Sequence, residues 1–345
     1  MTKWTYNHSH RKTSSKPIQA TLLLIGGIIL LIFAIGLSIL YGASDITART
    51  VIQSIINFNS NSTSHQIIRG LRIPRALAAA LIGAGLAMSG ALMQGMTRNP
   101  LASPSIMGVT AGATFSMAIA LVVTPGASNF IMMLWAFLGA GLGVAIVFGV
   151  GSISKTGLTP VKLALAGTAV TALLSSLSSA IAIHFNIAKD ISFWYAGGVS
   201  GVQWLQVQLL TPIALIGFVI ALFLANSITT LNLGEDVAKG LGQRTFAVKL
   251  IGTIVVLLLT GAAVSVAGTI GFIGLVIPHI TRFLVGVDYR WIIPCSAVLG
   301  GLLLVVADTI SRMVNPPFET PVGTITALVG VPFFLYLARR EGGSM

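Results

Sequence analysis

Charged residues are scarce in this sequence. Only 8% of its 345 residues are Asp, Glu, Lys or Arg, whereas 55% are hydrophobic. A water-soluble domain carries about a quarter charged residues, so this composition excludes an ordinary soluble globular protein. The single cysteine, Cys295, excludes an intrachain disulfide and any cysteine-based metal site. We interpret it as a small core residue.

Acidic residues are the scarcest charged class, with eight against twenty basic residues and a net charge of +12. None of the eight falls in the middle of a predicted apolar segment, where an ion-coupled carrier usually places its ion site. The chain also lacks a Gly-rich phosphate loop ending in Gly-Lys-Ser/Thr. Two alternatives are a secondary transporter or channel and a permease driven by a separate motor protein, and these absences favour the permease.

Several ligand classes are not indicated by the sequence. The five histidines lack the spacing of metal ligands, so we predict neither a metal site nor a cofactor. The basic residues lie in short polar gaps between apolar runs and form no cluster interleaved with aromatic residues. The positive charge therefore does not predict nucleic-acid binding.

Long apolar runs dominate the chain. A membrane-spanning helix needs about 20 mostly apolar residues. Eight segments meet this length, near 20–41, 73–95, 130–152, 161–184, 205–225, 248–268, 291–311 and 320–338, and two shorter ones at 103–123 and 270–286 are interrupted by Gly and Pro. We therefore predict an all-α, polytopic transmembrane bundle of about ten helices over residues 18–340. A polar extension, residues 1–17, precedes it.

The basic residues indicate the orientation of these segments, because such residues accumulate on the cytoplasmic side of membrane proteins. If the first of ten segments starts inside, fourteen basic residues fall inside and six outside. The inside set is Lys3, Arg11, Lys12, Lys16, Arg98, Lys155, Lys162, Lys239, Arg244, Lys249, Arg282, Arg290, Arg339 and Arg340, and the outside set is Arg49, Arg69, Arg72, Arg75, Lys189 and Arg312. Both termini are thus predicted to be cytoplasmic.

A weak internal repeat is visible at an offset of 178 residues. Gly83, Ala84, Gly90, Pro100 and Gly108 correspond to Gly261, Ala262, Gly268, Pro278 and Gly286. Under the ten-segment topology the two units run in opposite directions through the membrane. This arrangement is typical of the inverted repeats of transporters.

One polar loop, residues 226–247, is predicted to face the cytoplasm. It contains Asn232-Leu-Gly-Glu-Asp-Val-Ala-Lys-Gly-Leu-Gly242, followed by Gln243 and Arg244. Glu235 and Asp236 follow Gly234 directly, and acidic residues are favourable at a helix N-terminus. Gly242 is suited to ending that helix. We expect a short helix at the membrane surface, which is either an ordinary capped loop or the element on which a motor protein acts.

Three blocks of the sequence resemble the FecCD-type permease family, which imports iron–siderophores, haem and vitamin B12 in ATP-binding-cassette systems. The first comprises Leu71-Arg-Ile-Pro-Arg75, Gly83 to Gly90, Gln94, Arg98 to Pro104 and Gly108; the second is Gly234 to Gly242; the third comprises Ala267 to His279, Arg282, Asp308, Arg312, Glu319, Pro321 and Gly323. The resemblance covers nearly the whole chain from about residue 20, and only the polar extension before Ile18 departs from the family pattern.

The resemblance implies a type II ABC importer permease of a bacterial cytoplasmic membrane, paired with a second, identical or paralogous, permease subunit around a central pathway. A cytoplasmic ABC ATPase dimer is expected to dock on the loop, through Gly234, Glu235, Asp236, Ala238, Gly242 and Arg244. An extracellular or periplasmic substrate-binding (lipo)protein is expected to place its acidic residues on Arg72, Arg75 and Arg312. Membrane lipid is the other expected partner, and lipid headgroups are an alternative role for these arginines.

Further expectations concern local geometry. Arg72 and Arg75 are three residues apart, so both are expected to face outward together, and Arg312 lies one helical turn after Asp308, with which it is expected to pair. Helix breaks near the pathway are predicted at Asn99, Pro100, Pro104 and Pro278, because proline interrupts helical hydrogen bonding.

The cargo is the least determined feature. The stretch from Ala102 to Gly108 is most similar to ferric hydroxamate importers within the family, and haem and cobalamin stay open as alternatives.

Overall fold

The computed structural model describes residues 16–42, 46–152, 160–315 and 318–342, and within these ranges every regular element is helical. Residues 1–15 of the predicted N-terminal extension lie outside them. The elements in chain order are α1 (Pro17–Leu40), α2 (Ala48–Ile56), α3 (Thr63–Ile67), η1 (Ile68–Arg72), α4 (Ile73–Thr97), η2 (Pro104–Met107), α5 (Val109–Val123), α6 (Asn129–Ser152), α7 (Pro160–His184), α8 (Ala188–Ala196), α9 (Trp204–Leu233), α10 (Glu235–Gly240), α11 (Thr245–Ala267), α12 (Ile273–Val285), α13 (Tyr289–Met313) and α14 (Val322–Gly342).

Ten of these helices correspond to the ten predicted apolar segments. Over the described residues, seven are long and apolar enough to cross a membrane, and three more, within α5, α12 and α14, are apolar but shorter. The two segments expected to be short, 103–123 and 270–286, contain α5 and α12. The prediction of an all-α transmembrane bundle is confirmed.

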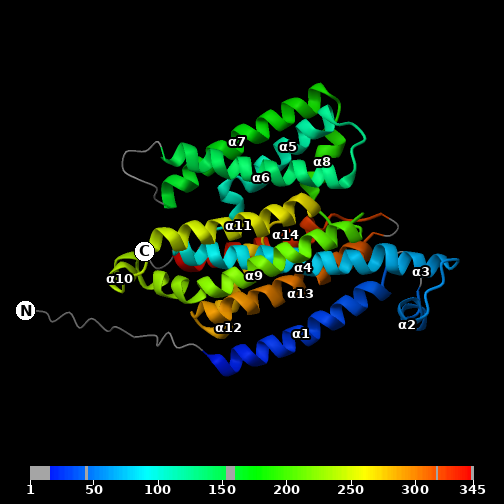
Figure 1. Ribbon diagram of the computed structural model, residues 1–345, viewed down its shortest axis with the longest axis horizontal. Helices are drawn as coiled ribbons and strands as arrows, with labels where there is room; N and C mark the ends of the chain where they lie inside the picture. The colour runs from blue at the N-terminus through cyan, green and yellow to red at the C-terminus, as the bar shows by residue number, and fades with distance from the viewer. Residues whose placement is uncertain (1–15, 43–45, 153–159, 316–317, 343–345) are drawn as a thin grey trace, which may run out of the picture.

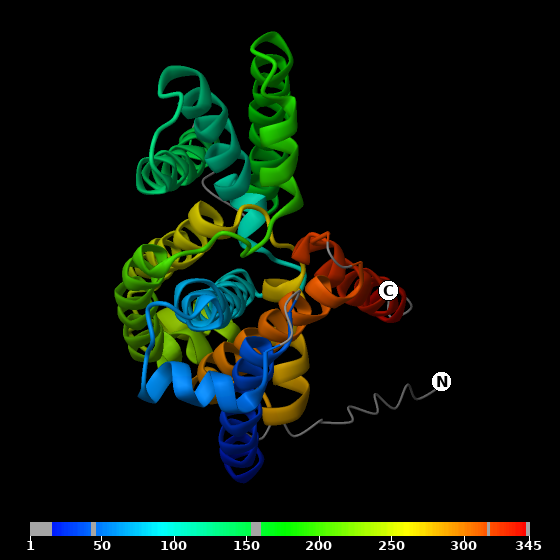
Figure 2. The same cartoon turned by 90° about the vertical axis from the view of Figure 1, so that its right-hand side faces the viewer.

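Helix α4 forms the centre of the bundle. It packs against α9, α11, α12 and α13, which surround it when the molecule is viewed along its long axis (Figure 2). Helices α5, α6 and α7 form a second group, which packs on the first mainly through α6 and α11 (Figure 1). Side chains of α4 are therefore mostly buried, whereas α1 exposes a row of Leu, Ile and Phe side chains at its outer face. Such an exposed apolar face suits contact with lipid.

Two glycines of α4 permit its close packing. A Cβ atom on Gly90 would overlap the carbonyl group of Gly274 in α12, and one on Gly83 would overlap that of Gly300 in α13. Small residues at helix contacts allow this backbone approach in membrane proteins. The high glycine content thus has a direct structural use at the centre of the fold.

The two ends of the bundle differ. Helices α2, α3 and α8 lie at one end of the long axis, which we call the α3 end, and α10 lies at the other, the α10 end (Figure 1). Glu319, which lies shortly before α14, contacts Arg75 at the start of α4 at the α3 end.

Asn99, Pro100 and Pro104 lie where nonhelical backbone was predicted. Arg98 ends α4 in a left-handed conformation, with φ of 52°, and the Asn99 side-chain oxygen accepts a hydrogen bond of 2.9 Å from the Leu101 amide. Pro104 begins the short helix η2. These contacts turn the chain from α4 into α5.

Pro278 does not break its helix. Helix α12 continues through it over 13 residues, and the nonhelical segment lies before the helix, between Gly268 and Phe272. The predicted break is therefore displaced toward the N-terminus, because positive φ angles at Gly268 and Phe272 already end and restart the helix there. Pro100 and Pro278, paired in the proposed repeat, consequently have different backbone surroundings.

Candidate functional site

At the α3 end, Arg72 closes the C-terminus of α1. Its Nη1 donates hydrogen bonds of 2.8 Å to the Ile39 carbonyl and 2.6 Å to the Leu40 carbonyl. The last carbonyls of a helix lack intrahelical partners and carry partial negative charge, so a cation is favourable there. The Arg72 side chain is thereby turned toward α1 and is only 6% exposed.

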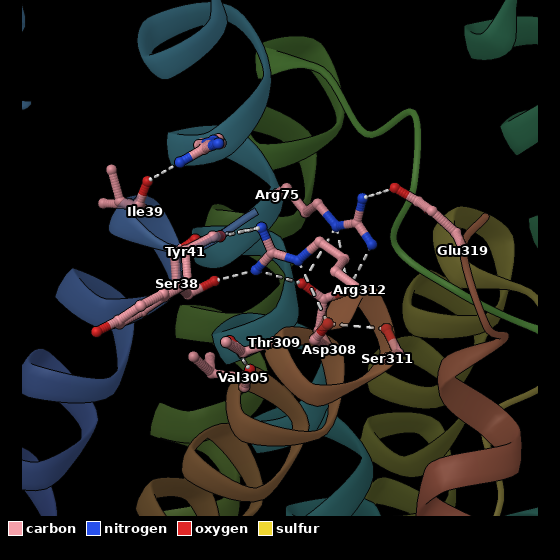
Figure 3. A network of polar contacts seen from close by, with 11 residues as sticks. Ser38, Ile39, Tyr41, Arg75, Val305, Asp308, Thr309, Ser311, Arg312 and Glu319 are labelled. Atoms are coloured by element: carbon pink, nitrogen blue, oxygen red, sulfur yellow. Dashed lines mark hydrogen bonds and ion pairs between the residues drawn. The ribbon is translucent and has the colours of Figure 1, made fainter. Parts of the chain in front are cut away.

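Asp308 of α13 is shared by two arginines. Arg75 of α4 donates through Nε to both carboxylate oxygens at 3.1 Å and through Nη2 to Oδ1 at 2.8 Å (Figure 3). Arg312 Nη2 lies 3.1 Å from Oδ2, so the pairing predicted from their spacing is confirmed. Asp308 is fully buried, and a buried carboxylate requires such paired donors.

Arg312 also joins α13 to α1. Its Nη2 donates to the Ser38 hydroxyl at 2.6 Å, and its Nη1 donates to the carbonyls of Ser38 and Tyr41 at 3.2 and 3.3 Å (Figure 3). Together with Arg72, it gives the end of α1 two cationic partners. Helices α1, α4 and α13 are thus tied together at the α3 end by one polar cluster, which we call the arginine cluster: Arg72, Arg75, Asp308, Arg312 and Glu319.

The expectation that Arg72 and Arg75 face outward together is wrong for Arg72. Arg72 ends η1 and Arg75 lies in the first turn of α4, and their side chains diverge because Arg72 binds the α1 carbonyls and Arg75 binds the buried Asp308. Arg75 also reaches an exposed carboxylate: its Nη1 donates to Glu319 Oε1 at 2.6 Å, and the Glu319 side chain is 45% exposed. Arg75 and Arg312 face the two carboxylates of Asp308 and Glu319, so positive and negative charges balance in this part of the cluster.

At the α10 end, the predicted loop helix is present as α10. Gly234 precedes it with φ of 142°, and Gly242 follows it with φ of 79°, both in conformations that favour glycine. The Gly242 amide donates to the Lys239 carbonyl at 2.9 Å, and the Gln243 amide donates to the Ala238 carbonyl at 2.9 Å. This is the pattern of a helix C-terminus closed by a left-handed glycine.

Glu235 fixes α10 against α11. Its carboxylate lies 2.6 Å from Lys249 Nζ and 3.3 Å from Lys239 Nζ. The hydrogen bond from Lys249, supported by the one from Lys239, holds the pKa of the Glu235 carboxyl below its usual value. Ala238 of α10 is completely buried, whereas Asp236 and Arg244 are exposed. The first acidic residue is therefore structural, and the second is free to meet a partner.

An apolar surface surrounds α10. Val237, Leu241 and Phe246 are 49, 70 and 77% exposed. They lie on the loop beyond the end of the long helix α9, and apolar side chains gathered at such a place typically mark an interaction surface. The sequence-based prediction named the glycines and charges of this loop but did not name these three residues, because each is an ordinary apolar residue in an apolar chain.

The arrangement defines a class of protein: a polytopic membrane permease whose two ends differ, with a polar cluster at the α3 end and a short surface helix at the α10 end. Residues 30–340 match the FecCD transport family, and the chain belongs to that family. The family predicted from the sequence blocks is thus confirmed. As a member, the chain is a membrane-spanning permease subunit of an ATP-binding-cassette importer.

Individual proteins are similar over nearly the whole chain. The iron(3+)-hydroxamate import system permease protein FhuB of Bacillus subtilis (strain 168) is 61% identical over 341 residues, covering 97% of this chain and 89% of that protein. The iron-uptake system permease protein FeuB of the same organism is 50% identical over 307 residues, covering 89% and 92%. A solved metal-chelate type ABC transporter in an inward-facing conformation superposes with a TM-score of 0.81 at 28% identity, covering 93% of this chain and 99% of that one.

Proposed function

We propose that the cargo of this importer is a ferric siderophore of the hydroxamate class, which moves into the cytoplasm. The 61% identity to a hydroxamate permease, extending over 97% of this chain, is the observation that carries the proposal. Haem and cobalamin are the alternatives; the cobalamin import system permease protein BtuC of Halobacterium salinarum is 39% identical over 82% of this chain, well below the identity to the hydroxamate permease. The chain lacks a nucleotide-binding loop, so it does not bind ATP through such a motif, and it lacks a mid-span carboxylate that could serve as an ion site. Both observations favour transport driven by a partner ATPase over transport driven by an ion gradient.

A cytoplasmic ATPase dimer is proposed to dock at the α10 end. The support is the exposed apolar surface of Val237, Leu241 and Phe246 beside the exposed charges Asp236 and Arg244. Interfaces with apolar centres and polar rims are the usual form of such contacts. In this orientation both termini would lie in the cytoplasm, in agreement with the larger number of basic residues predicted on that side.

A substrate-binding protein with acidic contact residues is proposed to dock at the α3 end. The arginines of the cluster support this, because complementary charge steers association and fixes the register of partners. The Arg75 side chain is itself only 11% exposed, but its Nη1 faces the exposed Glu319, whereas Arg72 and Arg312 are turned toward α1.

The pathway and the second permease subunit complete the proposal. Nonhelical backbone within a membrane is tolerated where it lines a cavity or is buried in protein, so the link containing Asn99, Pro100 and Pro104 and the segment before Pro278 are proposed to lie near the pathway. That pathway would run between this chain and a second, identical or paralogous, permease. Lipid would cover the exposed apolar face of α1.

Uptake measurements test the cargo. Cells lacking only this chain, but retaining the ATPase and binding protein of the system, would be supplied with a radiolabelled ferric trihydroxamate, a ferric catecholate or labelled cobalamin. Restoring the chain should restore uptake of the trihydroxamate and not of the other two. Selective restoration of cobalamin or catecholate uptake would overturn the cargo assignment. Accumulation of the labelled trihydroxamate in vesicles that have a pH or sodium gradient but no nucleotide would overturn the ATPase-driven mechanism.

A further inference from the structure

The two edges of the Arg75 guanidinium have different partners. The Nε–Nη2 edge is bound to Asp308, which is completely buried and is also held by Arg312. The remaining nitrogen, Nη1, donates to Glu319 at 2.6 Å, and Glu319 is almost half exposed. One carboxylate is therefore a fixed part of the fold, and the other sits where solvent or a partner reaches it (Figure 3).

Glu319 lies on a nonhelical segment, residues 318–321, between α13 and α14. The neighbouring Thr320 amide donates to the Ser311 carbonyl at 3.2 Å, so the segment is attached to α13 by its backbone even without the Glu319 side chain. The side chain can consequently leave Arg75 by rotation alone. The Asp308 side chain cannot move away in the same manner, because Arg75 and Arg312 would then lose their buried carboxylate partner.

We propose that Glu319 is an internal competitor for the docking site: it occupies Arg75 Nη1 until a carboxylate of the substrate-binding protein displaces it. The inference rests on the proposed docking at the α3 end. When Glu319 leaves, Arg75 and Arg312 share Asp308 alone, so this part of the cluster gains one unbalanced positive charge. Arg75 Nη1 is thereby released for a carboxylate of the partner, and Glu319 binds it again when the partner departs.

The competitor is useful in a transport cycle because the binding protein must dock and also dissociate. A tethered side chain competes at a high effective concentration without any change elsewhere in the fold. An ion pair with one exposed partner is weak enough to exchange. Removing the competitor is expected to tighten docking by roughly two- to fivefold, the ratio corresponding to such a pair.

The experiment measures the Kd of the substrate-binding protein for the purified, complete transporter in lipid nanodiscs at fixed ionic strength. Glu319→Gln should lower the Kd by that factor, chiefly through slower dissociation. Glu319→Asp, which keeps the charge, should stay close to the unmodified protein. Asp190→Asn is the matched control, since Asp190 is an exposed acid on α8 at the same end and belongs to no contact of the cluster.

The outcomes separate the inference from the docking proposal. Arg75→Gln should weaken binding, and Glu319→Gln added to it should then have no further effect. If Arg75→Gln weakens binding while Glu319→Gln leaves it unchanged or weaker, docking stands and the competitor is disproved. Equal tightening by Glu319→Gln and Asp190→Asn would reduce the effect to general electrostatics and overturn the inference. If Arg75→Gln has no effect, both proposals fail.

Discussion

Gln94 of α4 connects both ends of helix α12. Its Oε1 accepts a hydrogen bond of 2.6 Å from Arg282 Nη2 in the last turn of α12, and its Nε2 donates to the carbonyls of Gly274 and Leu275 in the first turn at 3.3 and 3.2 Å. Gln94 is 2% exposed, so its side-chain amide cannot bind solvent water and depends on these hydrogen bonds. One amide therefore holds α12 against the central helix.

Replacing Gln94 with Leu should destabilise the protein by about 1–3 kcal/mol, because the buried acceptors and part of the Arg282 guanidinium lose their partner. The measurement is thermal unfolding of the purified chain in detergent. Gln53→Leu on α2 is the matched control, since Gln53 is exposed and should change stability by about 0.5 kcal/mol at most. Equal unfolding temperatures for the two variants would contradict a stabilising role of Gln94.

Asp308→Asn should be more damaging than any other single change in the arginine cluster. It leaves Arg75 and Arg312 with a neutral partner in a buried place, and breaking a buried ion pair costs about 3–5 kcal/mol. We expect a large loss of unfolding temperature together with reduced protein levels in the membrane. Asp190→Asn should leave both unchanged. A stable Asp308→Asn variant would show that the two arginines have other sufficient partners.

The transmembrane helices were predictable because lipid requires long apolar helices, and their length and composition are visible in sequence. The short helices α2 and α8 were not predicted, since nine polar and apolar residues do not distinguish a surface helix from a loop. Pro278 was misjudged for a related reason. A proline lowers helical stability, but neighbouring helices can hold the backbone in place, and the sequence does not show those neighbours.

The arginine cluster was predictable only in part. The pair Asp308–Arg312 follows from helical spacing, because residues four apart share one face. Arg75 and Asp308 are separated by 233 positions, so their contact depends on the packing of α4 against α13. That packing depends in turn on glycine contacts such as Gly83 with Gly300, which no local pattern specifies. Glu319 lies in a nonhelical segment, where residue spacing does not predict which way a side chain points.

Gly90→Val tests the close packing of α4 and α12. The added side chain would overlap the Gly274 backbone, so the helices must separate, and overpacking of this kind costs about 1–3 kcal/mol or more. We expect a lower unfolding temperature and loss of uptake. Gly36→Val on α1 is the matched control, because a Cβ there meets no atom within 4 Å. Similar behaviour of both variants would mean that valine harms these helices without regard to packing.

Gly242→Ala tests whether the shape of the α10 loop matters for coupling to the ATPase. Gly242 has φ of 79°, which strains any residue with a Cβ by roughly 1 kcal/mol or more, whereas Gly240 lies two residues earlier in ordinary helical backbone with open space around it. Gly240→Ala should therefore transport normally. Gly242→Ala should insert normally but show weaker ATPase association and reduced uptake, and Gly242→Trp should abolish uptake. Co-purification of the ATPase with each variant, at matched membrane levels, provides the measurement. Normal uptake by Gly242→Trp would reduce the loop to a simple connector.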